Sequence, residues 1–452
     1  MSSTNGTNGT NGTKEAPVVD AAIATRPNDL EAVPGLLKDL NDNIGTLSAD
    51  DHQARYGLLL KARSIVQALE APRETMIKHC WAQVGPLPRS TDMRVTRLDQ
   101  LETKTGAIAG INFGVYTGLW KLMAKNGDRT QMVKDLAEAL GVDPALSCSP
   151  YIMKVDSCAI LVPWAISRRQ ASMSISLPTS QKSLSLPMIG DGYIAMTSCT
   201  GAGPLRFHEY SRKRGLKYPT DAKDTPMMYA YNTDKDMFAW QQDLGYGTHF
   251  NHHMSGYRQG RRPWMAPGFF PIKERLIEGA NTDADAPFLV DIGGSIGHDL
   301  AEFHSYYPKA PGKLILQDLP VVIGQIQELA PAITPMGHDF LTEQPVKGAR
   351  AYYMHSCLHD WPDHVCETIL KQIKAAMKPG YSKLLINENV IPSTGTWWET
   401  SALDMVMLTL FCSKERTEGD WYHLLEKIAG LKIVKIWGGG KGVESLIDVE
   451  LP

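Results

Sequence analysis

The 452-residue chain lacks the features that mark membrane, disulfide-rich and nucleic-acid-binding proteins. Its longest apolar run, Cys158–Ile166, is less than half of the roughly 20 residues that a membrane helix needs. The seven cysteines are scattered, odd in number and without a C-x-x-C pair, which argues against a disulfide framework or a zinc knuckle. A formal net charge of −3 provides no positive field for phosphate backbones or anionic lipids. We therefore expect a cytoplasmic protein that binds neither nucleic acid nor membrane.

The N-terminal part of the chain divides into a polar tail and a helical region. Residues 1–20 are a low-complexity Ser, Thr, Asn and Gly tail that we expect to be disordered. Apolar residues recur at helical spacing between positions 36 and 82, and again before a glycine stop at Gly141. Tyr193–Met196 followed by Thr197–Gly203 suggests the strand and loop of a wing. The predicted N-terminal domain, residues 21–270, is therefore helical and winged-helix-like.

A long patternless stretch interrupts this domain. Residues 147–187 show neither a sustained hydrophobic period nor plausible helix caps. We interpret the stretch as an unexplained insertion.

The C-terminal part, residues 271–452, has the rhythm of a doubly wound α/β domain. Apolar runs at Phe288–Ile292, Leu314–Leu316, Ala351–Met354 and Leu384–Ile386 alternate with helix-like segments, as a parallel sheet covered on both faces requires. The segment Asp363–Lys378 predicts a helix with Asp363 as its N-cap. The sequence therefore predicts a Rossmann-like fold for this domain.

A glycine-rich turn after the first predicted strand indicates a nucleotide-type cofactor. Gly293, Gly294 and Gly297 would let the backbone turn sharply and approach a ligand at a helix N-terminus. Asp318 ends the next strand about 20 residues on, where a carboxylate can hold a ribose diol. The spacing lacks the G-x-G-x-x-G fingerprint of dinucleotide sites, which favours S-adenosylmethionine. Further along, Asp339 could accept from an adenine amino group while Phe340 packs on the ring.

Six segments in this order resemble class I O-methyltransferases of plant caffeate type and their fungal secondary-metabolism relatives. They are Asp291–Gly297, Gln317–Pro320, Gly337–Phe340, Leu358–Asp363, Leu385–Glu388 and Lys414–Glu418. The resemblance implies S-adenosylmethionine as cofactor, a small hydroxylated acceptor, no metal and a homodimer formed through the N-terminal domain.

The resemblance also implies roles for single residues. His359 would be the general base, and Glu388 and Glu415 would orient and polarise it from either side. The family often has Lys or Arg at the position of His355, which we count among the cofactor-binding residues, and Gly at that of Ser295.

The chemistry of His359 can be argued without the family. A hydroxyl attacks a sulfonium methyl group well once a neutral imidazole removes its proton, and a nearby carboxylate stabilises the imidazolium that results. The alternatives are a helix-capping or core histidine at 359 and plain surface carboxylates at Glu388 and Glu415.

Two further groups of residues invite a functional interpretation. Four apolar residues at helical spacing could form an acceptor-binding wall, although such a stripe is equally a core face: Met405, Met407, Leu408 and Phe411. The histidines at 249, 252 and 253 could suggest a metal, but no fourth ligand stands at a telling distance.

The main alternative function is a methyltransferase-like pericyclase that binds the cofactor without transferring methyl. Such an enzyme would be expected to hold a permanently charged Lys or Arg where this chain has His359. A non-catalytic dimeric scaffold is the third possibility, favoured if the insertion disrupts the N-terminal fold.

Overall fold

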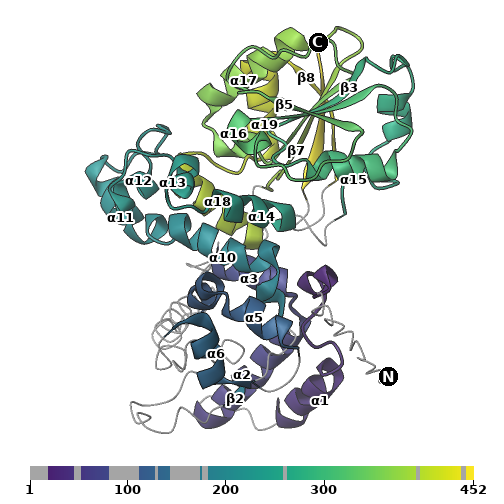
Figure 1. Ribbon diagram of the computed structural model, residues 1–452. Coiled ribbons are helices and arrows are strands. Elements are labelled where there is room, and N and C mark those ends of the chain that lie inside the picture. The colour runs from purple at the N-terminus through teal and green to yellow at the C-terminus, as the bar shows by residue number, and fades with distance from the viewer. Residues whose placement is uncertain are drawn as a thin grey trace, which may run out of the picture. The chain divides into compact units, whose positions relative to one another are not determined.

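The computed structural model describes residues 19–44, 52–80, 111–127, 131–142, 174–175, 182–257, 262–392, 396, 398–438 and 444–452 (Figure 1). By its internal contacts the chain forms two compact units. Unit 1 comprises residues 1–72 and 105–186, and unit 2 comprises residues 73–104 and 187–452. None of the described helices is both long and apolar enough to cross a membrane.

Unit 1 is helical, as the apolar spacing predicts. Its elements are η1 (Ala21–Ala24), α1 (Val33–Ile44), α2 (His52–Leu69), α5 (Leu119–Lys125), β1 (Gln131–Met132), α6 (Val133–Leu140), β2 (Ser174–Ile175) and η3 (Ser183–Ser185). The expected glycine stop is confirmed, because Gly141 ends α6 in the left-handed conformation at φ 65°. Most of the proposed insertion, residues 147–173 and 176–181, lies outside the described residues, as does the tail 1–18. Two parts of it are described: Ser174–Ile175 pairs antiparallel with Gln131–Met132, and residues 182–187 contain η3 and the first residue of the following helix.

The wing predicted at residues 193–203 is wrong. Tyr193–Met196 belongs to a helix, α10 (Pro187–Thr200), which packs against α14 (Gly247–Tyr257). Most residues of α10 are buried, from Ile189 through Met196. A helix that is apolar on all sides shows no 3.6-residue period, so its buried Tyr-Ile-Ala-Met run suggested a strand.

The helices that precede the sheet belong to unit 2. They are α3 (Pro72–Cys80, from Arg73 on), α10, α11 (Gly203–Lys213), α12 (Pro226–Tyr231), α13 (Met237–Asp243), α14 and the short π-helix η4 (Lys273–Ile277). A helix from the C-terminal part of the chain, α18 (Trp398–Phe411), packs against α10, α11 and α12 (Figure 1). Because α18 packs against these helices, residues 187–270 belong to the same unit as the sheet, and no unit boundary falls at residue 271, where the sequence predicts one.

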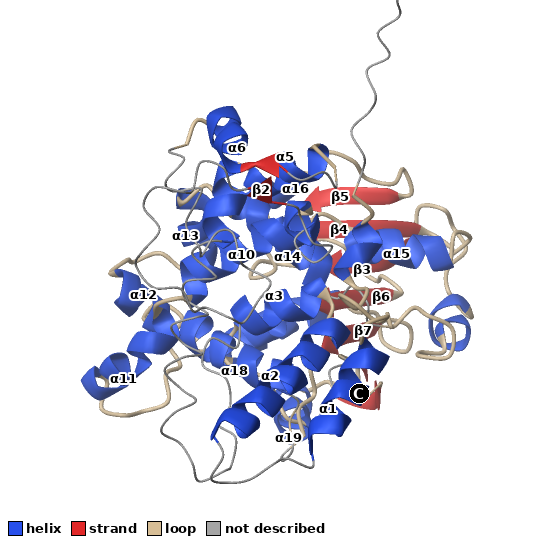
Figure 2. Cartoon of the chain, turned by 90° about the horizontal axis from the view of Figure 1, so that it is seen from below, coloured by secondary structure: helices blue, strands red, loops and turns tan. Residues whose placement is uncertain are grey.

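A seven-stranded sheet forms the rest of unit 2. Its order is β5-β4-β3-β6-β7-β9-β8, and Figure 2 shows the first five stacked in this sequence. Those five are parallel, whereas β9 runs antiparallel to both of its neighbours. The strands are β3 (Pro287–Ile292), β4 (Lys313–Asp318), β5 (Ile333–Gly337), β6 (Ala351–His355), β7 (Lys383–Glu388), β8 (Lys432–Trp437) and β9 (Ser445–Glu450). The four apolar runs therefore predict β3, β4, β6 and β7 correctly.

Helices cover both faces of the sheet, as the unbroken apolar strands require. The remaining elements are α15 (His298–Tyr306), α16 (Pro320–Ile323), η5 (Leu358–Asp360), α17 (Asp363–Ala376), α19 (Glu418–Tyr422) and the π-helix η6 (His423–Ile428). Consecutive residues of β6 point to opposite faces of the sheet and belong to different hydrophobic clusters. Tyr352 packs in the cluster that includes α17, and Tyr353 packs in the one that includes α15. The helix predicted to begin at Asp363 does so, with Pro362 rather than Asp363 at the N-cap.

Candidate functional site

The predicted cofactor-binding residues and Glu388 lie at one edge of the sheet. Parallel strands bring their carboxyl ends to the same edge, where ligands of open α/β sheets bind. Here β3 leads into the glycine turn, β4 ends in Asp318, and β5 leads to Asp339. Next to them, β6 ends in His355 and β7 in Glu388.

The glycine turn needs glycine at each of the three predicted positions. A Cβ on Gly293, whose φ is 74°, would lie 2.7 Å from the Cys357 sulfur. A Cβ on Gly294 would lie 2.5 Å from a carboxylate oxygen of Asp291. Gly297 takes a φ of 91° as the N-cap of α15. Ser295 also has a positive φ of 54°, a conformation that strains any residue with a side chain.

Asp318 braces this turn. One carboxylate oxygen accepts the backbone N–H of Ser295 at 2.7 Å, and the other accepts that of Leu319 at 2.7 Å. Burial raises the pKa of the Asp318 carboxyl, and the two hydrogen bonds oppose this rise. The carboxylate therefore faces the glycine turn, where the sequence predicts a ribose-binding acid.

Phe340 lies beside the same turn, next to Asp339. The Phe340 ring is 3.7 Å from where a Cβ of Gly293 would stand, and its edge meets Trp361 at a centroid distance of 6.2 Å. The half-buried Asp339 accepts the N–H of Leu341 at 2.9 Å. The Phe340 ring therefore borders the turn, and the adenine contacts of Asp339 and Phe340 stay a prediction.

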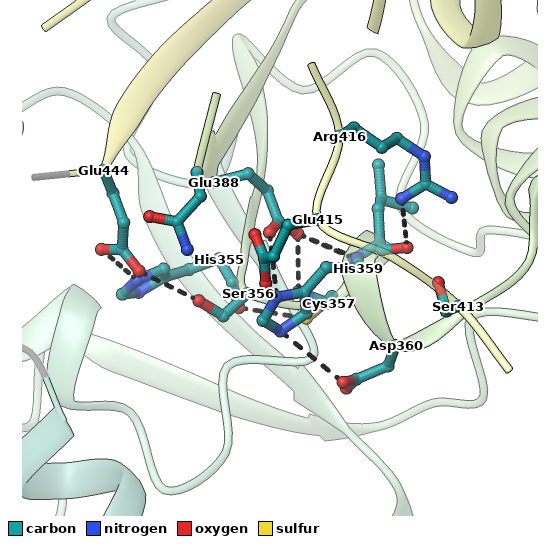
Figure 3. A network of polar contacts seen from close by, with 12 residues as sticks. His355, Ser356, Cys357, His359, Asp360, Glu388, Ser413, Glu415, Arg416 and Glu444 are labelled. Carbon is teal, nitrogen blue, oxygen red and sulfur yellow. Dashed lines mark hydrogen bonds and ion pairs between the residues drawn. The ribbon is translucent and has the colours of Figure 1, made fainter. Parts of the chain in front are cut away.

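His359 lies in the short turn η5 and is buried among carboxylates (Figure 3). Its Nδ1 is 2.7 Å from Glu415 Oε1 and 3.6 Å from Glu388 Oε2. Its Nε2 is 3.6 Å from Asp360 Oδ1. Glu388 and Glu415 are 1% and 2% exposed, which rules out the alternative of plain surface carboxylates.

Glu388 and Glu415 make different contacts with the segment that carries His359. Glu388 Oε1 accepts three backbone N–H groups of the turn, from Cys357 at 3.0 Å, Leu358 at 2.9 Å and His359 at 3.3 Å. It therefore fixes the backbone that carries the histidine. Glu415, whose own N–H is held by Asp404 of α18 at 2.9 Å, bonds the imidazole directly.

Arg416 supports the turn that carries His359, a role that the sequence did not suggest. Its guanidinium donates to the carbonyl oxygens of Leu358 and Trp361, both at 2.8 Å, and it is 1% exposed. Asp363 accepts from the same group at 2.8 Å. The signal available was its place next to Glu415 in the segment Lys414–Glu418, since an arginine inside a motif is a candidate for a fork-like contact with backbone oxygens.

The carboxylates determine the charge of His359. Burial disfavours the imidazolium, but Glu388, Glu415 and Asp360 outweigh burial and raise the pKa of His359 well above its ordinary value. Burial also raises the pKa of Asp360, to about 7, although His359 lowers it. The charges of His359 and Asp360 therefore depend on each other.

His355 is held by two carboxylates of its own. Its Nδ1 is 2.7 Å from Asp299 of α15, and its Nε2 is 3.1 Å from Glu444. Burial lowers the pKa of His355, but the two carboxylates outweigh burial and raise it to about 10. Both ring nitrogens are thus engaged within the protein, and the predicted contact of His355 with cofactor stays a prediction.

The four residues of the proposed acceptor wall on α18 differ in burial. Met407 and Phe411 are buried, and Phe411 lies 5.7 Å from the Phe238 ring of α13. Leu408 is half-buried, while Met405 is 41% exposed. The pocket role of the four residues stays a prediction, with Met407 and Phe411 the better placed for an enclosed site.

The three neighbouring histidines lie on α14. His252 Nδ1 bonds Asp191 of α10 at 2.6 Å, and His249 Nε2 is 3.9 Å from the other oxygen of Asp191. Burial lowers the pKa of His253 to about 4, so its ring is neutral. Within the described part of the chain, no group of three or more His, Cys, Asp or Glu side chains could hold a metal ion.

Known proteins resemble this chain in sequence and in fold. Residues 274–432 match the O-methyltransferase domain family. The O-methyltransferase mfmE of Annulohypoxylon moriforme is 31% identical over 424 residues, which cover 92% of this chain and 95% of mfmE. A solved structure titled "A Pericyclic Reaction enzyme" is 25% identical with a TM-score of 0.67, covering 93% of this chain and 100% of that one.

A second solved structure extends the likeness in fold. OxaC in complex with sinefungin and meleagrin is 23% identical with a TM-score of 0.68, covering 93% of this chain and 99% of that one. The full-length match to mfmE, together with the domain match over the glycine turn and the histidine site, shows the family. This chain belongs to the S-adenosylmethionine-dependent O-methyltransferases.

Proposed function

We propose that this protein methylates a hydroxyl of a small aromatic or polyketide-type secondary metabolite, with His359 as the general base. The observation that carries the proposal is the 2.7 Å contact between His359 Nδ1 and Glu415. A base oriented by a buried carboxylate is the arrangement that proton abstraction requires.

The residues at the sheet edge fit S-adenosylmethionine. Gly293 and Gly294 let the turn pack against Cys357 and Asp291, where a Cβ would collide, and Asp318 presents a carboxylate beside the turn. Asp318 would hold the ribose, while Asp339 and Phe340 would flank adenine. When bound, the cofactor supplies an electrophilic methyl group.

The protein's own contribution is to hold and move a proton at His359. With its Nδ1–H donated to Glu415, a neutral imidazole keeps the Nε2 lone pair for the acceptor hydroxyl. The carboxylates of Glu415 and Glu388 then stabilise the imidazolium that forms. Arg416 and Glu388 hold the η5 turn, and a fixed base geometry supplies part of the acceleration.

The raised pKa of His359 sets a pH requirement. The carboxylates favour the protonated ring, so the base must lose this proton before it can accept one from the acceptor. Activity should therefore rise with pH, with a midpoint above the ordinary histidine value of about 6.5.

The test is transfer of a labelled methyl group to hydroxylated acceptors by wild type and His359→Ala. The variant should lose about 10²–10⁴-fold in turnover, the usual contribution of positioned proton transfer, with unchanged affinity for S-adenosylhomocysteine. His364→Ala, which alters an exposed histidine of the neighbouring helix, is the matched control and should keep full activity. Full methylation by His359→Ala would remove the base from the proposal.

A second candidate function is ring formation without methyl transfer. It is supported by the charge that the carboxylates place on His359, because a permanent cation there could polarise a carbonyl. The 25% identity to a pericyclic reaction enzyme points the same way. Product formed without label, with activity retained by His359→Lys, would favour this function.

We also propose that the protein is a cytoplasmic homodimer. The described cysteines, Cys80, Cys199, Cys357, Cys366 and Cys412, are all free, which supports a reducing compartment. Light scattering coupled to size exclusion tests the dimer, and a mass of one chain would contradict it.

A further inference from the structure

A second polar network lies beside the His359 cluster and joins three parts of the chain (Figure 3). His355, at the end of β6, is bonded to Asp299 in the first turn of α15 and to Glu444 directly before β9. The hydroxyl of Tyr353 donates to the same Asp299 oxygen at 2.7 Å. The imidazole thus connects the helix that follows the glycine turn with the strand that borders β7.

Glu444 accepts hydrogen bonds from two further residues besides contacting His355. Its Oε1 accepts the Ser356 hydroxyl at 3.2 Å, and its Oε2 accepts the Asn387 amide at 3.5 Å in addition to facing His355. Glu444 is 6% exposed, so its charge must be met by such partners. One carboxylate therefore holds two consecutive residues of the same turn.

The turn that Glu444 holds is strained and leads into the cofactor site. Ser356 has a φ of 49°, which a residue with a side chain adopts only when its surroundings impose it. Its backbone N–H is held by the Asn387 carbonyl at 3.1 Å. The next residue, Cys357, places its sulfur 2.7 Å from where a Cβ of Gly293 would stand. Two residues further on comes His359.

We propose that Glu444 is a positioning residue for cofactor binding, which fixes the Ser356 turn through His355 so that Cys357 packs correctly against Gly293. The inference rests on the proposed S-adenosylmethionine site. Asp299 anchors the other side of His355 to α15, whose first residues follow the glycine turn. The Ser356 turn and the start of α15 are therefore both held by the His355 ring.

Charge explains why the network needs a cation in its centre. Among the described residues, Asp299 and Glu444 form ion pairs with His355, and the Tyr353 hydroxyl is bonded to Asp299. Two buried carboxylates without a cation between them would repel each other. The two carboxylates keep His355 protonated, in agreement with its raised pKa of about 10. A lysine at this position should serve equally well, whereas a neutral residue should not.

The test is the affinity for S-adenosylhomocysteine, measured by calorimetry on the full chain. Glu444→Gln should weaken binding by about tenfold or more, as loss of supporting contacts around a site commonly does. The matched control is Glu450→Gln, which makes the same change at the other end of β9, away from the site edge. There the Glu450 carboxylate lies 2.8 Å from the Arg275 guanidinium. The affinity of this variant should equal that of wild type.

The charge requirement gives a second, independent comparison. His355→Lys should stay within about threefold of wild-type affinity, while His355→Gln should lose about as much as Glu444→Gln. In histidine-labelled protein, the NMR signal of His355 should titrate at lower pH in Glu444→Gln than in wild type, because a negative charge at its Nε2 is gone.

Three outcomes would overturn or separate the proposals. Wild-type affinity in Glu444→Gln with a lowered melting temperature would show that the network only stabilises the fold. Equal losses in His355→Lys and His355→Gln would refute the charge requirement. If Glu444→Gln is insoluble, this comparison alone tests the proposal. Failure of the wild type itself to bind S-adenosylhomocysteine would refute the proposed function instead.

Discussion

Replacing Glu415 by glutamine isolates the contribution of the carboxylate that orients His359. The change keeps the size of the side chain and removes one charge, 2.7 Å from the imidazole Nδ1. Both partners are buried, so solvent screens the contact little.

The size of the effect follows from the hydrogen bond that loses its charge. A hydrogen bond to a charged group contributes about 1.5–3 kcal/mol. If this stabilisation is expressed in the transition state, where the imidazolium forms, turnover falls by about 10- to 150-fold at the high-pH plateau.

The same change moves the pH profile. Removing a carboxylate lowers the pKa of His359, so more of the base is neutral at low pH while each neutral base is weaker. The deficit of Glu415→Gln should therefore be largest at high pH and smallest at low pH, and the acidic limb should lie at lower pH than in wild type.

The assay is labelled methyl transfer between about pH 5 and about pH 9, the range over which a histidine base titrates. Glu418→Gln, three residues away and exposed, is the control and should follow the wild-type profile. A deficit of the same size at every pH would mean that Glu415 supports the fold and does not tune the base. No deficit at all would mean that the orienting contact is irrelevant to turnover.

Three further predictions concern the cofactor edge. Asp318→Ala should weaken binding of S-adenosylhomocysteine by about 10- to 150-fold in calorimetry, since a charged acceptor worth about 1.5–3 kcal/mol is lost and Ser295 loses its brace; equal affinity would remove Asp318 from the site. Gly294→Ala should reduce the free energy of unfolding in urea by about 1–3 kcal/mol, because the new Cβ would stand 2.5 Å from an oxygen of Asp291, and an unchanged midpoint would disprove the crowding. The pKa of His355 is about 10 in the folded protein and about 6.5 in an unfolded chain, so its stabilisation is fully present below pH 6.5 and is lost as pH rises through 10. Unfolding midpoints should fall over that window in wild type and less in His355→Gln, and parallel profiles would contradict the assignment.

The sheet and the His359 site could be predicted because they depend on local patterns. Buried parallel strands appear as short apolar runs; the glycine turn follows β3, Asp318 ends β4, and His359 lies in the turn after β6. The edge strand β5 was missed because it lacks such a run: it contains Pro335, and its burial is uneven. The acidic partners of His359 were implied by family resemblance, since they lie 29 and 56 residues away in sequence.

Other features depend on contacts that no local pattern encodes. Helix α10 is buried on all sides, and its wing-like sequence gave no helical period. Nothing near Glu444 indicates that it meets His355, which precedes it by 89 residues. The charge of His359 likewise depends on three carboxylates from separate segments, so a neutral resting base was the natural expectation from sequence and a protonated one is what the geometry favours.

The antiparallel direction of β9 has a consequence for how the protein is made. Parallel strands reach the edge that carries the candidate site only with their last residues, whereas β9 reaches it with its first, and Ser445 lies opposite Glu388. The strand is also interior, since β8 joins the sheet only through it. During synthesis, β8 must therefore wait without a partner strand, and this edge of the sheet is completed only after residues 444–450 have left the ribosome.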